Sequence, residues 1–191
     1  MDKQQLSDGD ISRGCRQNDP KAWRHLIRAN TALVYRIAMR MLRDRRDAED
    51  ASQEVFMRVY RSIESHDPTR PIAPWISKIT YNVCLKRISK KSGVEKKEFA
   101  LSTDNPAEEI SLNTPETQLT KKQMANTIEK ALDRISAQDR ALIAMRYSEG
   151  FTDSEIAEST DMPVGTVKTR LHRARGKLRK ILAPFIREVS A

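Results

Sequence analysis

The chain has 191 residues, 38% of them hydrophobic and 32% charged, and its 35 Lys and Arg against 26 Asp and Glu give a net charge of +9. Only 6 glycines in so charged a chain favour helices over a turn-rich β architecture, so we expect an all-α protein. The excess of positive charge suits a polyanionic partner, whereas the absence of any run of about 20 apolar residues excludes a membrane span.

The first block of the chain, residues 10–91, has the spacing of several amphipathic helices. Apolar residues recur at intervals of three and four between Trp23 and Met41, and a second stripe follows a polar turn at residues 44–47. Three prolines exclude a helix between residues 66 and 74, and we expect the next helix to start at Trp75. The block predicts a compact bundle of three or four helices.

The second block, residues 92–118, lacks a sustained period. It contains two prolines, scattered Ser, Thr and Asn, and more acidic than basic residues. A loop of this length is unusual inside one compact domain. We therefore interpret it as an acidic, flexible linker between two small helical domains, with a packed surface loop as the alternative.

The third block, residues 119–187, is helical again and ends in a helix-turn-helix pattern. Gly150 stops one helix, and Thr152 and Glu155 have the spacing of a capping box at the start of a short helix. A turn at residues 160–161 and Pro163 then predict a longer helix from about residue 163 to 182.

That last helix combines an apolar face with an outer face that is nearly all cationic. No acidic residue occurs between Pro163 and Glu188, so the basic residues have no opposite charge at i,i+4 spacing on the same helix. A DNA major groove, which admits one helix between rows of phosphates, fits this face. A membrane surface is the alternative, but it leaves the preceding short helix unexplained.

No pattern points to catalysis. The chain has no glycine-rich phosphate loop and no paired nucleophile and base, and its two cysteines and three histidines do not have metal-ligand spacing. We therefore expect no enzyme, no cofactor, no metal site and no catalytic residue. Because residues 1–10 are polar and acidic, we also expect no signal peptide and a cytoplasmic protein.

Several stretches resemble one family, the extracytoplasmic-function (ECF) sigma factors of the sigma-70 family. The run GTVKTRLHRAR at residues 165–175, with residues 135–140, 145–151 and 155–157 before it, is similar to their region 4. The run DAEDASQEVF at residues 47–56 is similar to region 2.2. Pro74-Trp75-Ile76 with Tyr81-Asn82 is similar to regions 2.3 and 2.4.

The resemblance implies a sigma factor that binds core RNA polymerase, recognises the −35 and −10 promoter elements and promotes strand opening. Region 2 would span residues 10–91 and region 4 residues 119–187. Contacts with the polymerase would involve the β′ clamp helices and the β flap. The residues implied to bind the β′ clamp helices are Asp47, Asp50, Gln53, Glu54 and Phe56. An anti-sigma factor is the implied negative regulator.

The resemblance also implies two DNA sites. Lys78, Tyr81 and Asn82 are expected to project away from Ile76 and Val83, toward the single strand of the −10 element. The alternative is that Tyr81 packs and Asn82 caps. The residues implied at this site are Trp75, Lys78, Tyr81, Asn82, Lys86 and Arg87. The loop before Trp75 reads PTRPIAP, where relatives often carry an aromatic residue.

The duplex −35 element would be read by the last helix. Thr169, His172 and Arg173 are expected at base edges, and Lys168, Arg170 and Arg175 at phosphates. The full set implied at this site is Thr166, Lys168, Thr169, Arg170, His172, Arg173 and Arg175. The alternative function is a helix-turn-helix transcriptional regulator that binds duplex DNA without polymerase.

Overall fold

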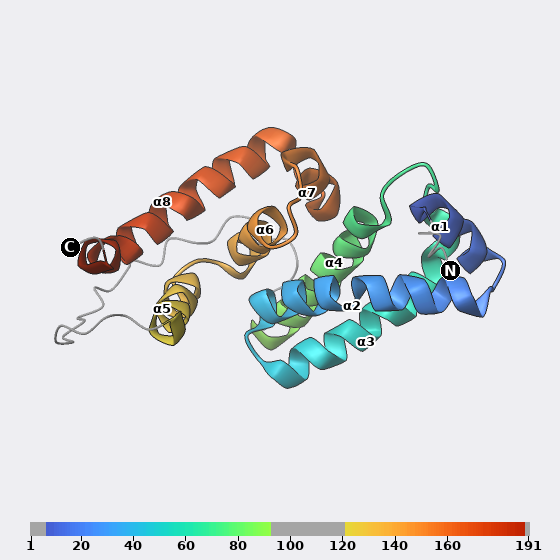
Figure 1. The fold of residues 1–191 in the computed structure, drawn as a ribbon, viewed down its shortest axis with the longest axis horizontal. Coiled ribbons are helices and arrows are strands. Elements are labelled where there is room, and N and C mark those ends of the chain that lie inside the picture. Colours follow the sequence, from blue (N-terminus) through green and yellow to red (C-terminus); the bar gives the residue numbers. More distant parts are fainter. Residues whose placement is uncertain (1–6, 93–120, 190–191) are drawn as a thin grey trace.

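The computed structural model describes residues 7–92 and 121–189, and this part of the chain is all helical (Figure 1). The first half comprises α1 (Asp8–Arg16), α2 (Pro20–Leu42), α3 (Arg45–Ser62), the 3-10 turn η1 (Ile63–Ser65) and α4 (Ile72–Ser92). The second half comprises α5 (Lys121–Asp133), α6 (Ala137–Tyr147), α7 (Asp153–Thr160) and α8 (Val164–Val189). The predicted all-α class is confirmed, whereas the predicted linker lies outside the described residues except for Ser92.

A short connection sets α2 and α3 side by side. Arg43 ends α2 in the left-handed conformation, with a φ of 60°, and the Asp44 carboxylate accepts the amide hydrogen of Asp47 at the start of α3. The chain therefore reverses within two residues, and the two helices run antiparallel in Figure 1. Their facing stripes bury Val34, Ile37 and Val55 in the core.

Helix α4 starts three residues before the predicted position. It begins at Ile72, and Pro74 lies in its first turn, where a missing amide hydrogen breaks no helical hydrogen bond. The amide of Ile72 donates to the carboxylate of Asp8 at 2.9 Å. A residue far away in the sequence thus caps this helix, and the prediction of a start at Trp75 was wrong for that reason.

The helix-turn-helix prediction agrees with the local geometry of the second half. Thr152 and Glu155 form both hydrogen bonds of a capping box at the start of α7. Gly150 has a φ of 73°, as a turn after α6 requires, and Asp161 turns the chain between α7 and α8. Helix α8 is longer than predicted, because it continues through Pro184 to Val189.

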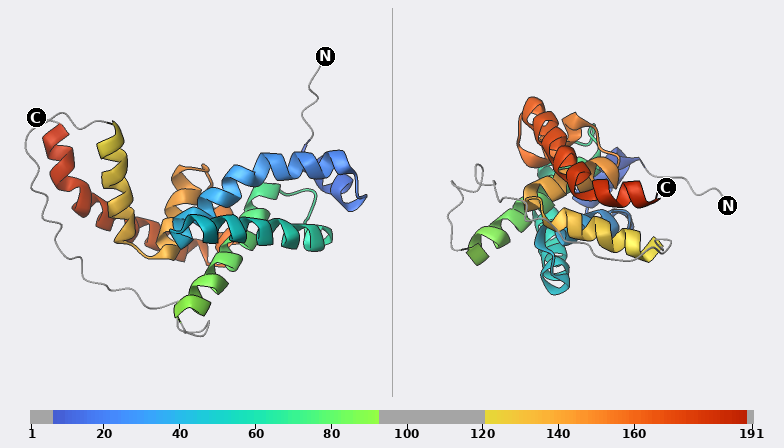
Figure 2. Two further views of the ribbon diagram at one scale, coloured as in Figure 1. Left: turned by 90° about the horizontal axis from the view of Figure 1, so that it is seen from below. Right: turned by 90° about the vertical axis from the view of Figure 1, so that its left-hand side faces the viewer.

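The two halves share one continuous core. Buried side chains of α2, α3 and α4 belong to the same hydrophobic cluster as Leu142, Met145 and Ile156 of α6 and α7. Figure 1 shows α6 and α7 beside α2 and α4, while α5 and the end of α8 extend beyond them; Figure 2 shows the same arrangement from two other sides. No helix in the described part of the chain combines the length and apolar character that a membrane crossing requires.

Two glycines inside helices should respond in opposite ways to the same substitution. A Cβ on Gly14 would lie 2.7 Å from the Cβ of Ala22, where α1 meets α2, whereas a Cβ on Gly176 in α8 would meet no atom within 4 Å. We expect Gly176→Ala to raise the free energy of unfolding by about 1 kcal/mol through helix propensity. Gly14→Ala should lower it by about 1–3 kcal/mol through overpacking. Denaturant unfolding measures both, and an equally stable Gly14→Ala variant would contradict the close approach of α1 to α2.

Candidate nucleic-acid interface

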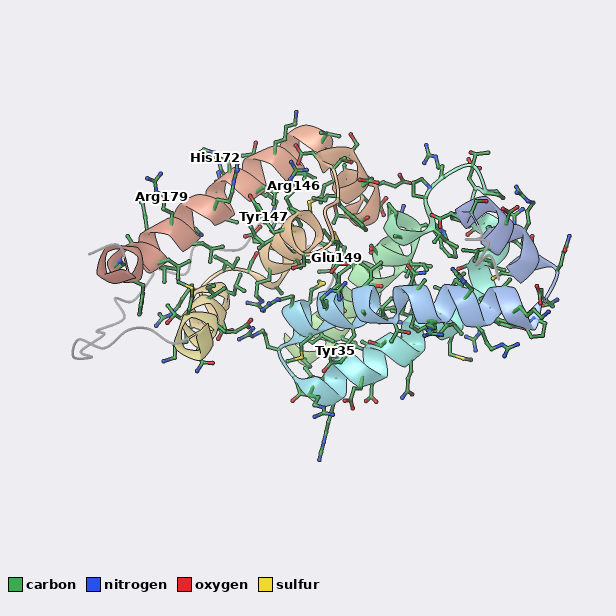
Figure 3. The ribbon with its side chains drawn as sticks, in the orientation of Figure 1. Tyr35, Arg146, Tyr147, Glu149, His172 and Arg179 are labelled. Atoms are coloured by element: carbon green, nitrogen blue, oxygen red, sulfur yellow. The ribbon has the colours of Figure 1, made fainter. Side chains whose placement is uncertain are left out.

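The outer face of α8 is exposed from Val164 to Lys180. Val167, Leu171 and Ala174 are buried on the inner side. Six of the seven residues predicted to read the −35 element are exposed: Thr166, Lys168, Thr169, His172, Arg173 and Arg175. Figure 3 shows His172 and Arg179 on the side of α8 that points away from the other helices. Within the described residues, Lys168, Arg173 and Arg175 form no ion pair with an acidic side chain, so their charge is available to an external partner.

Arg170, the seventh predicted residue, turns inward instead. Its Nε lies 2.8 Å from an Asp139 carboxylate oxygen and its Nη1 lies 2.7 Å from the Gln138 side-chain oxygen. Only 20% of the Arg170 side chain is exposed. In this structure its guanidinium fixes α8 to the start of α6 and does not project with its neighbours.

Sequence reasoning missed an apolar residue at the tip of α8. Val164 opens the helix and is 38% exposed, beside Thr166. A small exposed apolar group at the tip of a recognition helix can contact the methyl group of thymine. Helical spacing places Val164 in line with Val167 and Leu171, so periodicity alone predicts burial and could not have identified it as exposed.

The residues predicted at the −10 site lie along α4 but differ in accessibility. Asn82 and Lys86 are exposed, and Trp75 is half-buried. Tyr81 is only 2% exposed, and burial raises the pKa of its hydroxyl. Asn82 is therefore exposed as expected and Lys78 is half-buried, whereas Tyr81 packs in the interior, which was the alternative for this residue.

Helix α7 lies against the beginning of α4, and α7 and the turn after it bring acidic groups to basic side chains of α4 and of the loop before it. Asp161 accepts from Lys78 Nζ at 2.6 Å, and Glu158 accepts from Arg70 Nη1 at 2.9 Å. The Ser159 hydroxyl, which is buried, lies 3.1 Å from the carbonyl oxygen of Pro74. The second half of the chain thus covers the beginning of the predicted strand-binding surface.

A second set of contacts between the two halves of the chain connects α2 with α6 and the turn after it. Arg36 donates to both carboxylate oxygens of Glu149, at 2.6 and 2.7 Å. Arg140 donates to the carbonyl oxygen of Arg40 at 2.6 Å, at the end of α2 where helix carbonyls lack intrahelical partners. Periodicity within single helices carried no signal for either contact.

The polymerase-binding residues predicted on α3 also differ in accessibility, as those on α4 do. Asp50 and Gln53 are exposed, whereas Phe56 is half-buried and Asp47 pairs with Lys91. Although burial opposes the shift, hydrogen bonds from Arg87 and Arg58 lower the pKa of Glu54.

The sequence pattern did not identify two exposed apolar residues on α3. Met57 is 54% exposed and Tyr60 is 56% exposed. The centroid of the Tyr60 ring lies 5.0 Å from that of the Trp23 ring of α2. Large apolar side chains that remain exposed in this way are a common feature of protein-binding surfaces.

Comparison with known proteins decides the family. Residues 26–94 match the family model Sigma-70 region 2, and residues 125–178 match Sigma-70, region 4. The ECF RNA polymerase sigma factor SigW of Bacillus subtilis is 31% identical over 176 residues, which cover 87% of this chain and 92% of SigW. The chain belongs to the ECF RNA polymerase sigma factors. It is thus a transcription initiation factor of RNA polymerase, and a polymerase-independent regulator is not favoured.

Other relatives and solved structures agree with this family. The sigma factor SigE of Mycolicibacterium smegmatis is 31% identical over 170 residues, covering 88% of this chain and 65% of SigE. The structure of CnrH in complex with the cytosolic domain of CnrY has a TM-score of 0.64 at 18% identity, covering 93% of this sigma factor and 97% of CnrH. The structure of RpoE with the anti-sigma factor NepR from Bartonella quintana has a TM-score of 0.64 at 20% identity, with coverages of 85% and 98%. Both structures share the fold.

Two arginines three residues apart on α8 should differ in their effect on stability. Arg170→Ala removes hydrogen bonds to Asp139 and Gln138 and leaves a largely buried carboxylate without its partner. We expect it to lower the free energy of unfolding by about 1–3 kcal/mol. Arg173→Ala, at an exposed position, should change it by less than about 0.5 kcal/mol. Equal effects in denaturant unfolding would contradict the inward placement of Arg170.

Proposed function

We propose that this sigma factor divides promoter recognition between two helices and binds the polymerase through a third. Helix α8 reads the −35 element as duplex, and α4 with the loop before it holds the single strand of the −10 element. Helix α3 docks on the β′ clamp helices of core polymerase, and the region 4 helices contact the β flap. The observation that supports this division most directly is the cationic outer face of α8, which forms no ion pair with the acids in the described part of the chain.

The roles on α8 follow from where its side chains point. Thr169, His172 and Arg173 lie on the exposed face near the middle of a helix that fits the major groove, and an Arg there can pair with both acceptors of guanine. Lys168 and Arg175 flank them and suit phosphates, which take Lys and Arg regardless of base sequence. Arg170 keeps its structural role against α6, so its contribution to DNA binding is indirect.

The polymerase surface on α3 is mixed in character. Asp50 and Gln53 supply exposed polar groups, and Met57 and Tyr60 continue the same exposed side of the helix with apolar area. Polar groups around an apolar centre are typical of protein–protein interfaces. We therefore extend the predicted docking surface by Met57 and Tyr60.

Strand capture by α4 requires α7 to leave it. Tyr81 is buried in the observed arrangement, and Lys78 and Arg70 are paired with acidic residues of α7. Exposed ion pairs of this kind contribute only about 0–1 kcal/mol each, so the phosphates of a bound strand can replace them. The observed arrangement leaves the −35 helix accessible and the −10 surface partly covered.

A sigma factor working in this way acts in the cytoplasm with the polymerase and is not itself an enzyme. The solved structure of RpoE contains the anti-sigma factor NepR, and that of CnrH contains CnrY. An anti-sigma factor is the corresponding regulatory partner that we infer for this chain.

Runoff transcription with core polymerase tests the assignment on α8. Arg173→Ala should reduce initiation from a promoter with both elements by about 10- to 100-fold, as loss of a bidentate base contact costs about 1–3 kcal/mol. Arg134→Ala, an exposed arginine in the turn between α5 and α6, is the matched control and should retain activity. Unchanged initiation by Arg173→Ala, or tight operator binding that needs no polymerase, would contradict the proposed function.

Removing one acid from α7 tests whether α7 competes with the DNA strand. Asp161→Asn removes the partner of Lys78, so the full-length protein should bind a single-stranded −10 oligonucleotide several-fold more tightly. Glu49→Gln removes one exposed negative charge from α3 and controls for net charge. Fluorescence anisotropy at fixed salt measures both affinities. Equal gains in the two variants would show that the contact between α7 and α4 does not limit strand binding.

A further inference from the structure

Helix α1 lies outside both segments that match the sigma-70 family, since the region 2 match begins at residue 26. The structure nevertheless places it against the segment that leads into α4. We propose that α1 is a positioning element for −10 recognition, because it fixes the shape of the loop at residues 66–71 and the orientation of Trp75. This inference rests on the proposed role of that loop and of α4 in holding the DNA strand.

One face of α1 makes an ordered series of contacts with residues 64–72. Asp8 accepts the amide hydrogen of Ile72 at 2.9 Å, and a Cβ on Gly9 would lie 2.7 Å from the carbonyl oxygen of Pro68. Further along α1, Ser12 Oγ is hydrogen-bonded to His66 Nδ1 at 2.9 Å. Residues 8, 12 and 16 share a helix face, so all these contacts belong to one surface.

Arg16 completes the series at the end of α1. Its Nη2 donates to the carbonyl oxygen of Glu64 at 3.2 Å and to that of His66. These carbonyl groups follow α3, where the chain leaves regular helix. The order along α1 is therefore the reverse of the order along the loop, and the base of the loop is held at both ends and at its middle.

The contact with His66 links α1 to a residue predicted to meet the DNA. His66 is 2% exposed, and its ring centroid lies 5.1 Å from that of Trp75. Ser12, His66 and Trp75 thus form a continuous packed chain from α1 to the half-buried indole. Removal of Ser12 or a shift of α1 would free the imidazole and, through it, the indole.

The tip of the same loop is exposed, although Arg70 within it pairs with Glu158 of α7. Asp67 accepts hydrogen bonds from the amide and hydroxyl of Thr69, which shapes the turn, while Thr69, Arg70 and Pro71 are exposed. A loop with a fixed base and an exposed tip presents one shape to a base flipped out of the duplex. Such a site discriminates between bases only as well as its supporting contacts hold it.

The pH dependence of stability tests the burial of His66, the loop residue that α1 contacts through Ser12. Burial lowers the pKa of His66 and Arg16 acts in the same direction, whereas the Pro71 carbonyl and the carboxylates of Asp8 and Asp67 oppose the shift. The folded state therefore favours neutral His66, while the unfolded chain binds a proton near the ordinary pKa of 6.5. Stability should fall as pH drops below 6.5. His66→Gln should reduce the change in the denaturation midpoint between pH 7.5 and 5.5. His172→Gln, at an exposed position, should leave that change as it is in the unaltered protein. Equal slopes in the two variants would contradict a buried neutral His66.

Promoter selectivity provides the decisive test. Full-length variants with core polymerase are assayed on a promoter library randomised in the −10 element with a constant −35 element. Ser12→Ala and Asp8→Ala should reduce the preference for the best −10 base several-fold and leave the −35 preference unchanged. Asp8→Asn retains an oxygen that can accept from Ile72 and should restore the preference. Ser77→Ala, a fully buried serine without a hydrogen-bond partner among the described residues, is the matched control.

The outcomes separate this inference from the proposed function. A uniform loss of activity on all promoters, or an unchanged −10 preference in folded Ser12→Ala and Asp8→Ala variants, would overturn the role of α1. If Ser12→Ala fails to fold, the comparison of Asp8→Ala with Asp8→Asn still decides, since Asp8 is exposed. Absence of −10 selectivity in the unaltered protein would instead refute the proposed function itself.

Discussion

Helix α4 is packed on two sides, and this constraint shapes the rest of the molecule. Ile76, Thr80 and Val83 are buried, and α2 and α3 pack against the helix. Tyr81 is also buried, although a helix at the surface of a small bundle normally leaves one side to solvent. The charged groups that act on its hydroxyl are Arg170 of α8 and Asp139 of α6, so the second half of the chain covers it, while α7 packs on the beginning of α4. In our proposal the DNA strand needs the surface that α7 occupies, so interdomain packing and strand binding exclude each other.

The distribution of charge agrees with the idea that packing between the two halves and strand binding exclude each other. Glu158 of α7 pairs with Arg70, and Asp161 at the end of α7 pairs with Lys78, whereas the cations on the outer face of α8 find no acid among the described residues. Because exposed ion pairs contribute little, the contact between α7 and α4 is stabilised mostly by buried groups such as Ile156 and Ser159. In our proposal, duplex recognition by α8 is therefore compatible with the observed arrangement, and strand capture by α4 requires a change.

Local patterns in the sequence predicted the local structure. The capping box of Thr152 and Glu155 and the buried stripe of α8 depend on neighbours within one or two turns, so they could be derived from spacing alone. The start of α4 depends on Asp8, and the inward turn of Arg170 depends on Asp139. Such contacts join residues far apart in the sequence, and a projection of a single helix contains no information about them. For the same reason the sequence could not decide whether Tyr81 meets the DNA strand or packs, and in the structure it packs.

The burial of Tyr81 in the free protein, and its release on strand binding, is the central claim. The most direct measurement is ¹⁹F NMR of 3-fluorotyrosine-labelled protein, with the Tyr81 signal assigned by Tyr81→Phe. The account predicts a Tyr81 signal that is insensitive to a soluble paramagnetic agent in the free protein and shifts when polymerase and a −10 strand are added. A signal that is already solvent-accessible in the free protein, or that stays unchanged in the complex with an open promoter, would contradict it.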